Sequence, residues 1–346
     1  MALCAVMLTA CDDSLIYDDA GDCSTKVQFV FRKHRQALHS VAGRETDVFY
    51  STVGSVHLFV YDEQTGELVA ERFEKTENLK TAAELGLGNG EERCFMQLDV
   101  EPGTYRLVAW CGLDETDRNN AFFLTDGSRA PEGYRLCDVK RSASGADPVS
   151  FEKYESVYHG SVSRAVVNAN GDGTEIIPIE LTKNNNDIAV WIQHSSATLH
   201  DGEYEVVYTD ANGTMSFDDN SLADASSLEY HPHSQSLLTS STEYNGDLVE
   251  AGALVAHIST SRLLESNVAS ARLEVRKNTG ETVFSIPFIR YLLEMQTFTR
   301  DSQYYLDCED TYNCSFYLTG EEDGTWMPAR IIINNWVRVP DQNADI

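Results

Sequence analysis

Short runs that alternate between apolar and polar residues recur along the chain and are separated by turn sequences. The run from Lys26 to Arg32, for example, places Val27, Phe29 and Phe31 on one face. A period of two is typical of a β-strand with one buried face, and runs with a helical period are nearly absent. Further strands are expected at residues 55–62, 67–72, 94–100, 104–111, 134–138, 157–161, 175–181, 188–193, 204–208, 254–259, 271–275, 282–286, 304–306, 315–318 and 330–338. The pattern predicts an all-β fold of antiparallel β-sandwiches.

Two turn sequences predict β-hairpins. Glu101-Pro102-Gly103 would join the strands at 94–100 and 104–111, because Pro and Gly favour a tight reversal of the chain. Asn212-Gly213 is typical of a two-residue turn and would close a hairpin after the strand at 204–208.

Two short helices are also expected. Thr81 and Glu84 have the spacing of a capping box, in which each side chain bonds the backbone N–H of the other residue, and Gly86 would end that helix. Residues 288–296 form the best helix candidate in the second half of the chain.

The polar stretch Lys183-Asn184-Asn185-Asn186-Asp187 divides the chain into two parts of similar length. With 346 residues, the chain is long enough for two domains of ordinary size. We therefore predict a signal peptide at residues 1–10, an acidic tether at 11–24, an N-terminal β-sandwich domain at 25–185 and a C-terminal β-sandwich domain at 186–346.

The first eleven residues indicate a bacterial lipoprotein signal. An apolar run ends in Leu8-Thr9-Ala10-Cys11 and is followed by Asp12 and Asp13. A signal peptidase would cut before Cys11, and acyl chains on that cysteine would attach the protein to a membrane. The run is too short to span a bilayer, which takes about 20 residues. No Lys or Arg precedes it, and the alternative is an ordinary secretory peptide whose cysteine is incidental.

Composition narrows the classes of partner. The chain has 55 acidic and 26 basic residues and a formal net charge of -29, which repels nucleic acid and anionic membrane surfaces. It has 16 Tyr and 14 Phe but only 8 Pro, so it is not a disordered stalk. We expect no nucleic-acid partner, and membrane attachment through Cys11 alone.

The cysteines predict disulfides. After Cys4 leaves with the signal peptide and Cys11 takes lipid, an even number remains, as is usual in exported proteins with disulfides. Cys308 and Cys314 would face each other across the end of a hairpin and form one bridge; the alternative is two buried thiols. The other four are Cys23, Cys94, Cys111 and Cys137, for which three connectivities stay open.

Sites for metal or catalysis are weakly supported. Asn168, Asn170 and Asp172 match the first half of a calcium loop, but its twelfth position is Ile179 where a bidentate Glu is needed, so a surface turn is favoured. His231-Pro-His233 is interpreted as a pair of surface residues. The motifs G-x-S-x-G, H-E-x-x-H and G-x-x-x-x-G-K-[ST] are absent from the sequence. We expect no cofactor, no metal and no enzymatic activity.

Several segments, in order along the chain, resemble the fimbrillin-associated anchor proteins of type V fimbriae. After the lipoprotein signal, these are Asp18-Asp19-Ala20-Gly21-Asp22-Cys23, the V-x-F-x-F strand at 27–31, and residues 56–62, 102–110, 305–307, 315–318, 326 and 331–336. The resemblance implies two tandem transthyretin-like domains and a lipoprotein exposed on the cell outer membrane. It also implies a role at the base of a fimbria, where the protein binds the fimbrillin stalk subunit and accessory fimbrial subunits and limits fimbrial length.

Two details follow from this resemblance. The family usually has Arg where this chain has Cys308, and a second cysteine at 314 supports a paired substitution. Polymerising subunits of this class lose an N-terminal strand by cleavage after an Arg, whereas an anchor cut there would lose its lipid. Arg32, Arg35 and Arg44 are therefore expected to stay uncut. The rival functions are a surface adhesin or glycan-binding lipoprotein on the same fold, including a fimbrial tip subunit, and an enzyme with a dispersed site.

Overall fold

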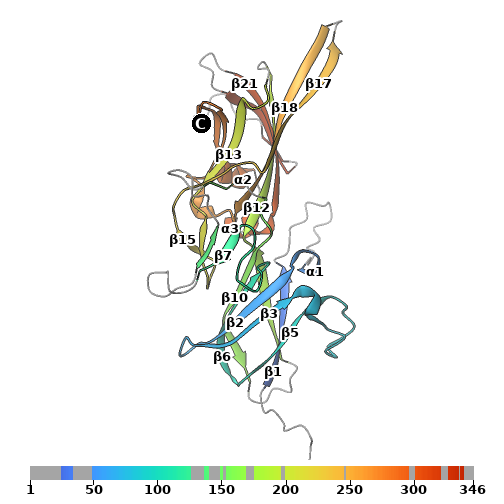
Figure 1. Cartoon of the computed structure of the whole chain (residues 1–346), viewed down its shortest axis with the longest axis vertical. Helices are drawn as coiled ribbons and strands as arrows, with labels where there is room; N and C mark the ends of the chain where they lie inside the picture. The colour runs from blue at the N-terminus through green and yellow to red at the C-terminus, as the bar shows by residue number, and fades with distance from the viewer. Residues whose placement is uncertain are drawn as a thin grey trace, which may run out of the picture.

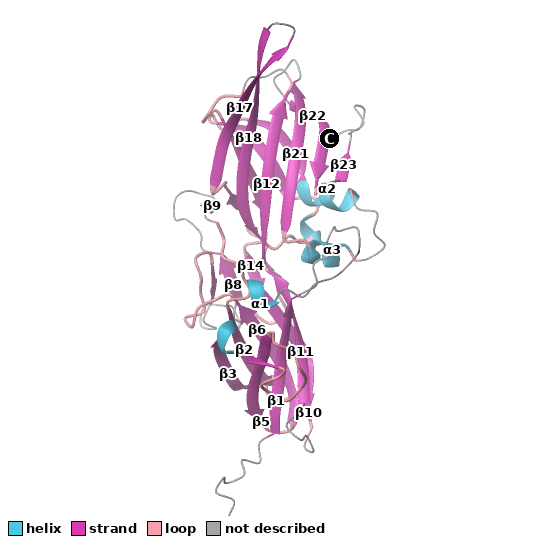
Figure 2. Cartoon of the chain, turned by 90° about the vertical axis from the view of Figure 1, so that its right-hand side faces the viewer, coloured by secondary structure: helices cyan, strands magenta, loops and turns pink. Residues whose placement is uncertain are grey.

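The chain is an all-β protein with a few short helices, as its sequence pattern predicts (Figure 2). The computed structural model describes residues 25–33, 49–125, 136–139, 149–150, 153–168, 175–195, 199–244, 247–295, 301–320, 326–334 and 336–338. The strands gather into two lobes stacked end to end (Figure 1). The transthyretin-like form of each lobe stays a prediction.

The first lobe is a sandwich formed by one strongly folded sheet of eight strands. Their order is β3-β2-β6-β10-β11-β1-β5-β4, and only two residue pairs join β10 to β11, so the sheet bends there into two layers. The strands are β1 (Thr25–Lys33), β2 (Ser55–Asp62), β3 (Leu68–Lys75), β4 (Lys80–Thr81), β5 (Arg93–Val100), β6 (Gly103–Cys111), β10 (Tyr158–Val167) and β11 (Glu175–Lys183).

Strand β6 contributes to two hydrophobic cores. Tyr105, Leu107, Ala109 and Cys111 face the core of the first lobe, together with residues of β1 and β2. The alternate residues Val108 and Trp110 belong to the larger core that continues into the second lobe. Because successive side chains of a strand point to opposite faces, one strand can hold the two lobes together.

The second lobe packs a six-stranded sheet against a five-stranded sheet. The six-stranded sheet has the order β17-β18-β12-β21-β22-β23, and the five-stranded sheet has the order β20-β19-β13-β16-β9. The strands are β9 (Val149–Ser150), β12 (Asn185–His194), β13 (Tyr204–Asp210), β16 (Leu228–Tyr230), β17 (Ser234–Tyr244), β18 (Asp247–Ser261), β19 (Arg272–Lys277), β20 (Thr282–Pro287), β21 (Thr311–Gly320), β22 (Trp326–Ile333) and β23 (Trp336–Arg338).

A segment from the first half of the sequence pairs with the second half. β7 (Phe122–Leu124) and β8 (Leu136–Val139) form a small sheet with β14 (Thr214–Ser216) and β15 (Leu222–Asp224), and β9 adds to β16. These strands precede Asn186 in the sequence but lie against the second lobe. The division of the chain into two domains at Asn186 stays a prediction.

The short helices follow the sequence in one case and depart from it in another. They are α1 (Phe49–Thr52), η1 (Thr76–Asn78), η3 (Glu265–Asn267), α2 (Phe288–Glu294) and α3 (Ser302–Cys308). The helix predicted at 288–296 is confirmed as α2. At 81–86 the helix prediction is wrong and the chain forms turns, although the capping-box contacts exist: Thr81 N donates to Glu84 Oε2 at 2.8 Å, and Glu84 N donates to Thr81 Oγ1 at 3.1 Å.

Both hairpin predictions are wrong. β5 pairs with β1 and β4, whereas β6 pairs with β2 and β10, so Glu101-Pro102-Gly103 carries the chain from one layer of the sandwich to the other. Asn212-Gly213 likewise connects β13 and β14, which lie in different sheets. A turn sequence reports a reversal of the chain but not which strands become neighbours.

Parallel strand pairs run through the long axis of the molecule. β1 pairs in parallel with β11, and β12 pairs in parallel with β21. β11 ends at Lys183 and β12 begins at Asn185, so the two form an almost continuous path from one lobe into the other. Since Val27 lies opposite Glu175, the start of β1 lies beside the start of β11, at the pole away from the second lobe (Figure 1).

Among the described residues, no helix has the length and apolar character needed to cross a membrane.

Candidate functional site

The residues singled out in the sequence do not form one site. Cys11 and Cys23 lie outside the described residues, as do Asn170 and Asp172 of the calcium-loop candidate. Cys137 lies in β8, where its backbone pairs with Met215 and Leu124.

The hairpin expected around Cys308 and Cys314 is wrong. Residues 304–306 belong to α3, whose last residue is Cys308, whereas Cys314 lies within β21. Both residues are buried, and they are not bonded to each other in the structure. Burial raises the pKa of the Cys314 thiol well above its usual value.

Asn168 is hydrogen-bonded to Glu175, the first residue of β11, and the weak calcium-loop candidate stays a prediction. The Asn168 side-chain Nδ2 donates to Glu175 Oε1 at 2.8 Å, and its backbone N donates to Glu175 Oε2 at 3.2 Å. Across the described ranges, no three His, Cys, Asp or Glu side chains converge as metal ligands.

His231 lies between two glutamates on the second lobe. Its Nδ1 lies 2.8 Å from Glu205 Oε1 and its Nε2 lies 3.5 Å from Glu229 Oε2. Burial opposes the charged imidazolium, but the hydrogen bond that His231 donates to Glu205 and the charges of Glu205 and Glu229 raise the pKa of His231 above its ordinary value. The His231-Pro-His233 sequence is thus half-buried and ion-paired at its first histidine.

The polar stretch that the sequence marks as a break is a buried joint between the lobes. Asn184, Asn185 and Asn186 are 1%, 0% and 4% exposed. The side-chain amides of Asn184 and Asn220 donate to each other's oxygen at 2.6 Å, which ties the end of β11 to the loop after β14. Asn185 Oδ1 accepts a hydrogen bond from Val157 N at 3.2 Å.

The same joint reaches helix α3 and the end of β18. Asn186 Nδ2 donates to the Glu309 carbonyl at 2.8 Å, and its Oδ1 accepts from Leu263 N at 3.2 Å. Arg262 forms a two-point ion pair with Asp307, with Nε–Oδ1 at 2.7 Å and Nη2–Oδ2 at 2.6 Å. Asn184 and Asn186 have both the nitrogen and the oxygen of their amides bonded in this way, and buried groups paired like this favour a single arrangement of their elements.

Trp110 supplies the apolar part of the joint. Its side chain is fully buried, and its Nε1 donates to the Phe217 carbonyl at 3.0 Å. The Phe217 ring also packs against Phe59 of β2 at a centroid distance of 5.1 Å. The loop after β14 therefore packs against the outer face of β2 and β6.

Burial shifts several acid–base groups near this joint. It raises the pKa of Asp210 to about 6, although bonds from Tyr208, Ala211 and Asn267 favour the carboxylate. Burial, with the neighbouring Asp310 charge, raises the pKa of Glu309 to about 7. Burial lowers the pKa of His159 to about 4. These groups sit in the packed interior, so their shifts bear on stability.

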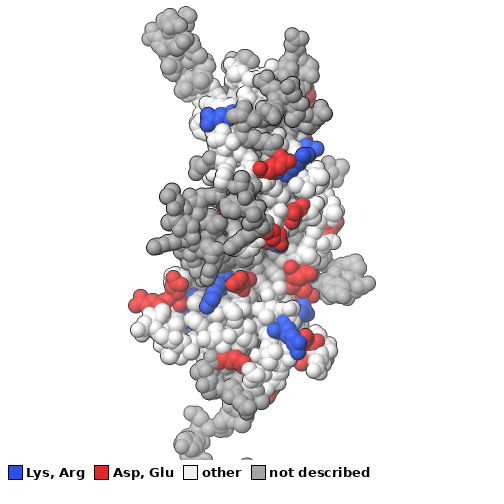
Figure 3. Space-filling view, turned by 180° about the vertical axis from the view of Figure 1, so that it is seen from behind, with Lys and Arg blue, Asp and Glu red and all other residues white. Residues whose placement is uncertain are grey.

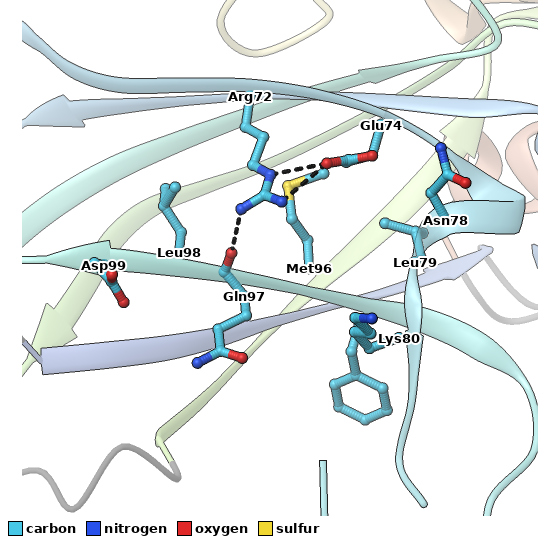
Figure 4. A pocket seen from close by; sticks show the side chains of 10 residues that line it. Arg72, Glu74, Asn78, Leu79, Lys80, Met96, Gln97, Leu98 and Asp99 are labelled. Atoms are coloured by element: carbon cyan, nitrogen blue, oxygen red, sulfur yellow. Dashed lines mark hydrogen bonds and ion pairs between the residues drawn. The ribbon is translucent and has the colours of Figure 1, made fainter. Parts of the chain in front are cut away.

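A shallow pocket of about 380 Å³ lies on the first lobe between β3 and β5. Arg72 reaches across it, donating to Glu74 Oε1 at 2.9 Å and to the Gln97 carbonyl at 2.8 Å (Figure 4). Leu79, Met96 and Leu98 form its apolar part. Arg72 already bonds the Glu74 carboxylate and the Gln97 backbone carbonyl. It therefore joins β3 to β5 and closes the edge of the sandwich.

Charges on the drawn surface are mixed in sign. On the face shown in Figure 3, acidic and basic side chains of the described residues alternate over both lobes without a continuous basic area.

The described part of the chain is thus an elongated β structure of two lobes, joined by buried asparagines and Trp110. The profile of the family described as fimbrillin-A associated anchor proteins Mfa1 and Mfa2 matches residues 19–340. The chain belongs to this family, as its sequence resemblance implied, and is a fimbria-associated protein of the cell envelope.

Solved structures share this fold. A candidate adhesin from Bacteroides thetaiotaomicron matches with a TM-score of 0.72 and 24% identity, over 93% of this chain and 99% of that chain. The fimbrial anchor protein Mfa2 from Porphyromonas gingivalis matches with a TM-score of 0.61 and 16% identity, over 92% and 99%. A candidate polysaccharide-binding protein from Bacteroides thetaiotaomicron matches with a TM-score of 0.68 and 21% identity, over 92% and 98%. No curated protein sequence matches.

Sequence reasoning missed two features. The partners of the asparagine stretch come from residues 220, 263 and 309, far along the chain, and no local pattern announces them. The long β17–β18 pair was also missed, although Asn245-Gly246 in the sequence is the turn signal that could have found it.

Proposed function

We propose that the chain is an outer-membrane lipoprotein that anchors a fimbria at its base through acyl chains on Cys11. In this proposal it binds the fimbrillin stalk subunit and thereby limits fimbrial length. Family membership and the Leu8-Thr9-Ala10-Cys11 signal support the proposal. Each buried acyl CH₂ contributes about 0.8 kcal/mol, and stable attachment takes more than one chain.

The polarity of the strand path is the observation that carries this proposal. Thr25, where β1 begins, lies at one pole, and the end of β17 and the start of β18 lie at the other (Figure 1). β11 and β12 contain nine and ten residues. At about 3.3 Å per residue, they alone span roughly 60 Å. A lipid placed before Thr25 would hold one pole at the membrane and leave the other for a fimbrial subunit.

Retention of β1 is part of the proposal. β1 lies between β11 and β5, and its Val27, Phe29 and Phe31 are at most 1% exposed. Cleavage that removes this strand would expose the core of the first lobe and would also separate the protein from its lipid. Arg32 lies within β1, whereas Arg35 and Arg44 lie outside the described residues. N-terminal sequencing of the mature protein should find no chain that begins after any of these arginines.

The anchor role is tested by deleting the gene and complementing it with the wild-type chain, Cys11→Ala or the control Ser14→Ala. Electron microscopy then measures fimbrial length, and immunoblotting measures fimbriae shed into the medium. Deletion and Cys11→Ala should both give long, shed fimbriae, and Ser14→Ala should behave as wild type. Unchanged fimbriae in the deletion strain would refute the anchor role.

An adhesin or glycan-binding role is the second candidate, and one observation favours it. Trp191 of β12 and Tyr317 of β21 are each 37% exposed on the outward face of the six-stranded sheet, in neighbouring strands. Aromatic faces of this kind can stack on sugar rings. A glycan array that shows binding lost in Trp191→Ala, with fimbrial attachment intact, would favour this role over the anchor.

A further inference from the structure

The pole opposite Thr25 carries a two-stranded arm. β18 pairs with β12 only from Ala253 onward, whereas its pairing with β17 continues to Asp247. Residues 239–244 of β17 and 247–252 of β18 therefore extend beyond the rest of the six-stranded sheet, and Figures 1 and 2 show this ribbon projecting from the end of the second lobe. We refer to these two segments as the arm.

One side of β17 forms the edge of the sheet along both the arm and the lobe. β17 has eleven residues, and its register with β18 runs from Ser234–His257 to Tyr244–Asp247 without a bulge. Its sequence, SQSLLTSSTEY, has Glu243 as its single charged residue and contains no proline or glycine. We call the side of β17 away from β18 the β17 edge.

The other sheet edges in the described part of the chain carry features that discourage strand addition. β3 has four charged residues among its eight and a register shift against β2. β20 has a register shift and ends at Pro287. The remaining edge strands β4, β7, β9, β15 and β23 are only two or three residues long. The part of β18 that β12 does not cover, residues 247–252, carries Asp247, Glu250 and a glycine.

This contrast identifies the β17 edge as the exception. Short length, charge, proline and bulges are the means by which proteins prevent edge strands from pairing with other chains. A long, regular and uncharged edge instead presents a row of backbone N–H and C=O groups to any extended segment that fits beside it. All four means are absent from β17 before Glu243.

We propose that the β17 edge receives an extended segment of the neighbouring fimbrial subunit as an added β-strand. The inference rests on the proposed anchor function and names the contact surface for it. Ser234, Ser236 and Leu238 are exposed along the described part of this edge, and Leu238 is 48% exposed. The matching segment would be uncharged and would alternate apolar with small hydroxyl side chains.

A second copy of the chain fits this edge less well than another subunit. Two β17 strands related by a two-fold axis would pair antiparallel, as in an isologous dimer. β17 runs along the long axis of the molecule (Figure 1), so the two Thr25 poles would then point in opposite directions. Two chains tethered to one membrane could not adopt that arrangement.

Photo-crosslinking in fimbriated cells tests the contact. The full-length chain carries a photoreactive phenylalanine at Ser236, or at Val69 as the control; Val69 is 49% exposed on the charged edge strand β3. We expect an adduct at 236, identified by mass as a fimbrial subunit joined through one extended segment, and no such adduct at 69. An adduct between two copies of the chain, or equal adducts at both positions, would overturn the inference.

A pair of prolines tests the backbone pairing directly. Successive N–H groups of a strand point alternately to β18 and to the open edge, so Ser240→Pro and Ser241→Pro remove one of each kind. The proline that removes the N–H group of the open edge should leave the melting temperature unchanged. That variant should bind the purified stalk subunit at least about tenfold more weakly. Wild-type affinity in that variant would refute strand addition.

The two proposals fail in different ways. If deletion of the gene sheds fimbriae while no adduct forms at position 236, the anchor function stands and the β17 edge is not its contact. If deletion leaves fimbriae unchanged, the anchor function itself fails.

Discussion

Removal of one partner from the Arg262–Asp307 ion pair should loosen the joint between the lobes. The two side chains are only 13% and 11% exposed and meet at 2.6 Å. Arg262 Nη1 also donates to the Asn220 carbonyl at 3.0 Å, and Gln303 Nε2 donates to Asp307 Oδ1 at 3.0 Å. Asp307→Ala would leave a buried guanidinium without its counter-charge, which costs about 3–5 kcal/mol.

The exposed pair Arg290–Glu294 on α2 provides a matched control. Its N–O distance is also 2.6 Å, but its side chains are 64% and 38% exposed, so water screens both charges. Arg290→Ala should therefore leave the unfolding midpoint unchanged. The double variant Arg262→Met/Asp307→Leu should recover most of the loss seen in Asp307→Ala, because an apolar pair replaces the stranded charge.

The assay is urea unfolding followed by tryptophan fluorescence, with a double-mutant cycle over Arg262 and Asp307. We expect a coupling free energy of at least about 2 kcal/mol. A loss below about 1 kcal/mol in Asp307→Ala, or a double variant as unstable as the two single variants summed, would refute the reasoning.

Three further predictions follow from the same structure. Because burial raises the pKa of Asp210 from 3.8 to about 6, the folded state binds a proton more readily than the unfolded state. Asp210 alone should therefore add about 1 kcal/mol to the free energy of unfolding as the pH falls from 7.5 to 5, and Asp210→Asn should lose this contribution, measured as the difference between the two proteins in pH-dependent urea titrations. Gly112→Ala should lower the melting temperature more than Gly66→Ala: both have positive φ, but at 112 a Cβ would lie 2.1 Å from a backbone carbonyl, whereas at 66 it meets open space. Peptide mapping without reduction should find Cys308 and Cys314 unlinked, as in the structure; a peptide pair joined through them would restore the disulfide hypothesis.

The strands were largely readable from the sequence because burial imposes a period of two. In β6, the alternation that separates Tyr105, Leu107, Ala109 and Cys111 from Trp110 is the separation between the two cores. The family was also readable, since its segments recur in order along the chain and the profile match covers residues 19–340.

Which strands pair with each other was harder to predict from the sequence. The Glu101-Pro102-Gly103 turn is local chemistry and fits a hairpin and a crossing between layers equally well, and only the cores decide which forms. Residues 304–306 show the same limit. A short apolar run fits a strand or a helix, and contacts of α3 with the joint favour the helix, among them the bond from Gln303 Nε2 to the Leu263 carbonyl and the Arg262–Asp307 pair.

The burial of the three asparagines between the lobes could not be predicted from local sequence, for a different reason. Asn184, Asn185 and Asn186 have the composition of a solvent-exposed loop. The burial of Asn184 and Asn186 becomes favourable because partners from distant parts of the chain bond both ends of their amides, as Asn220 does for Asn184. Such a site is defined by its partners, and those become neighbours only after folding.

Immunogold labelling of the chain on intact fimbriated cells tests the anchor role most directly. An epitope inserted after Thr65, in the exposed turn between β2 and β3 and away from the β17 edge, would be visualised by electron microscopy together with the cell surface. The proposal predicts gold particles where each fimbria meets the outer membrane, and their loss from the cell together with the fimbriae in Cys11→Ala. Gold at the free ends of attached fimbriae would contradict the anchor role and place the chain at the tip.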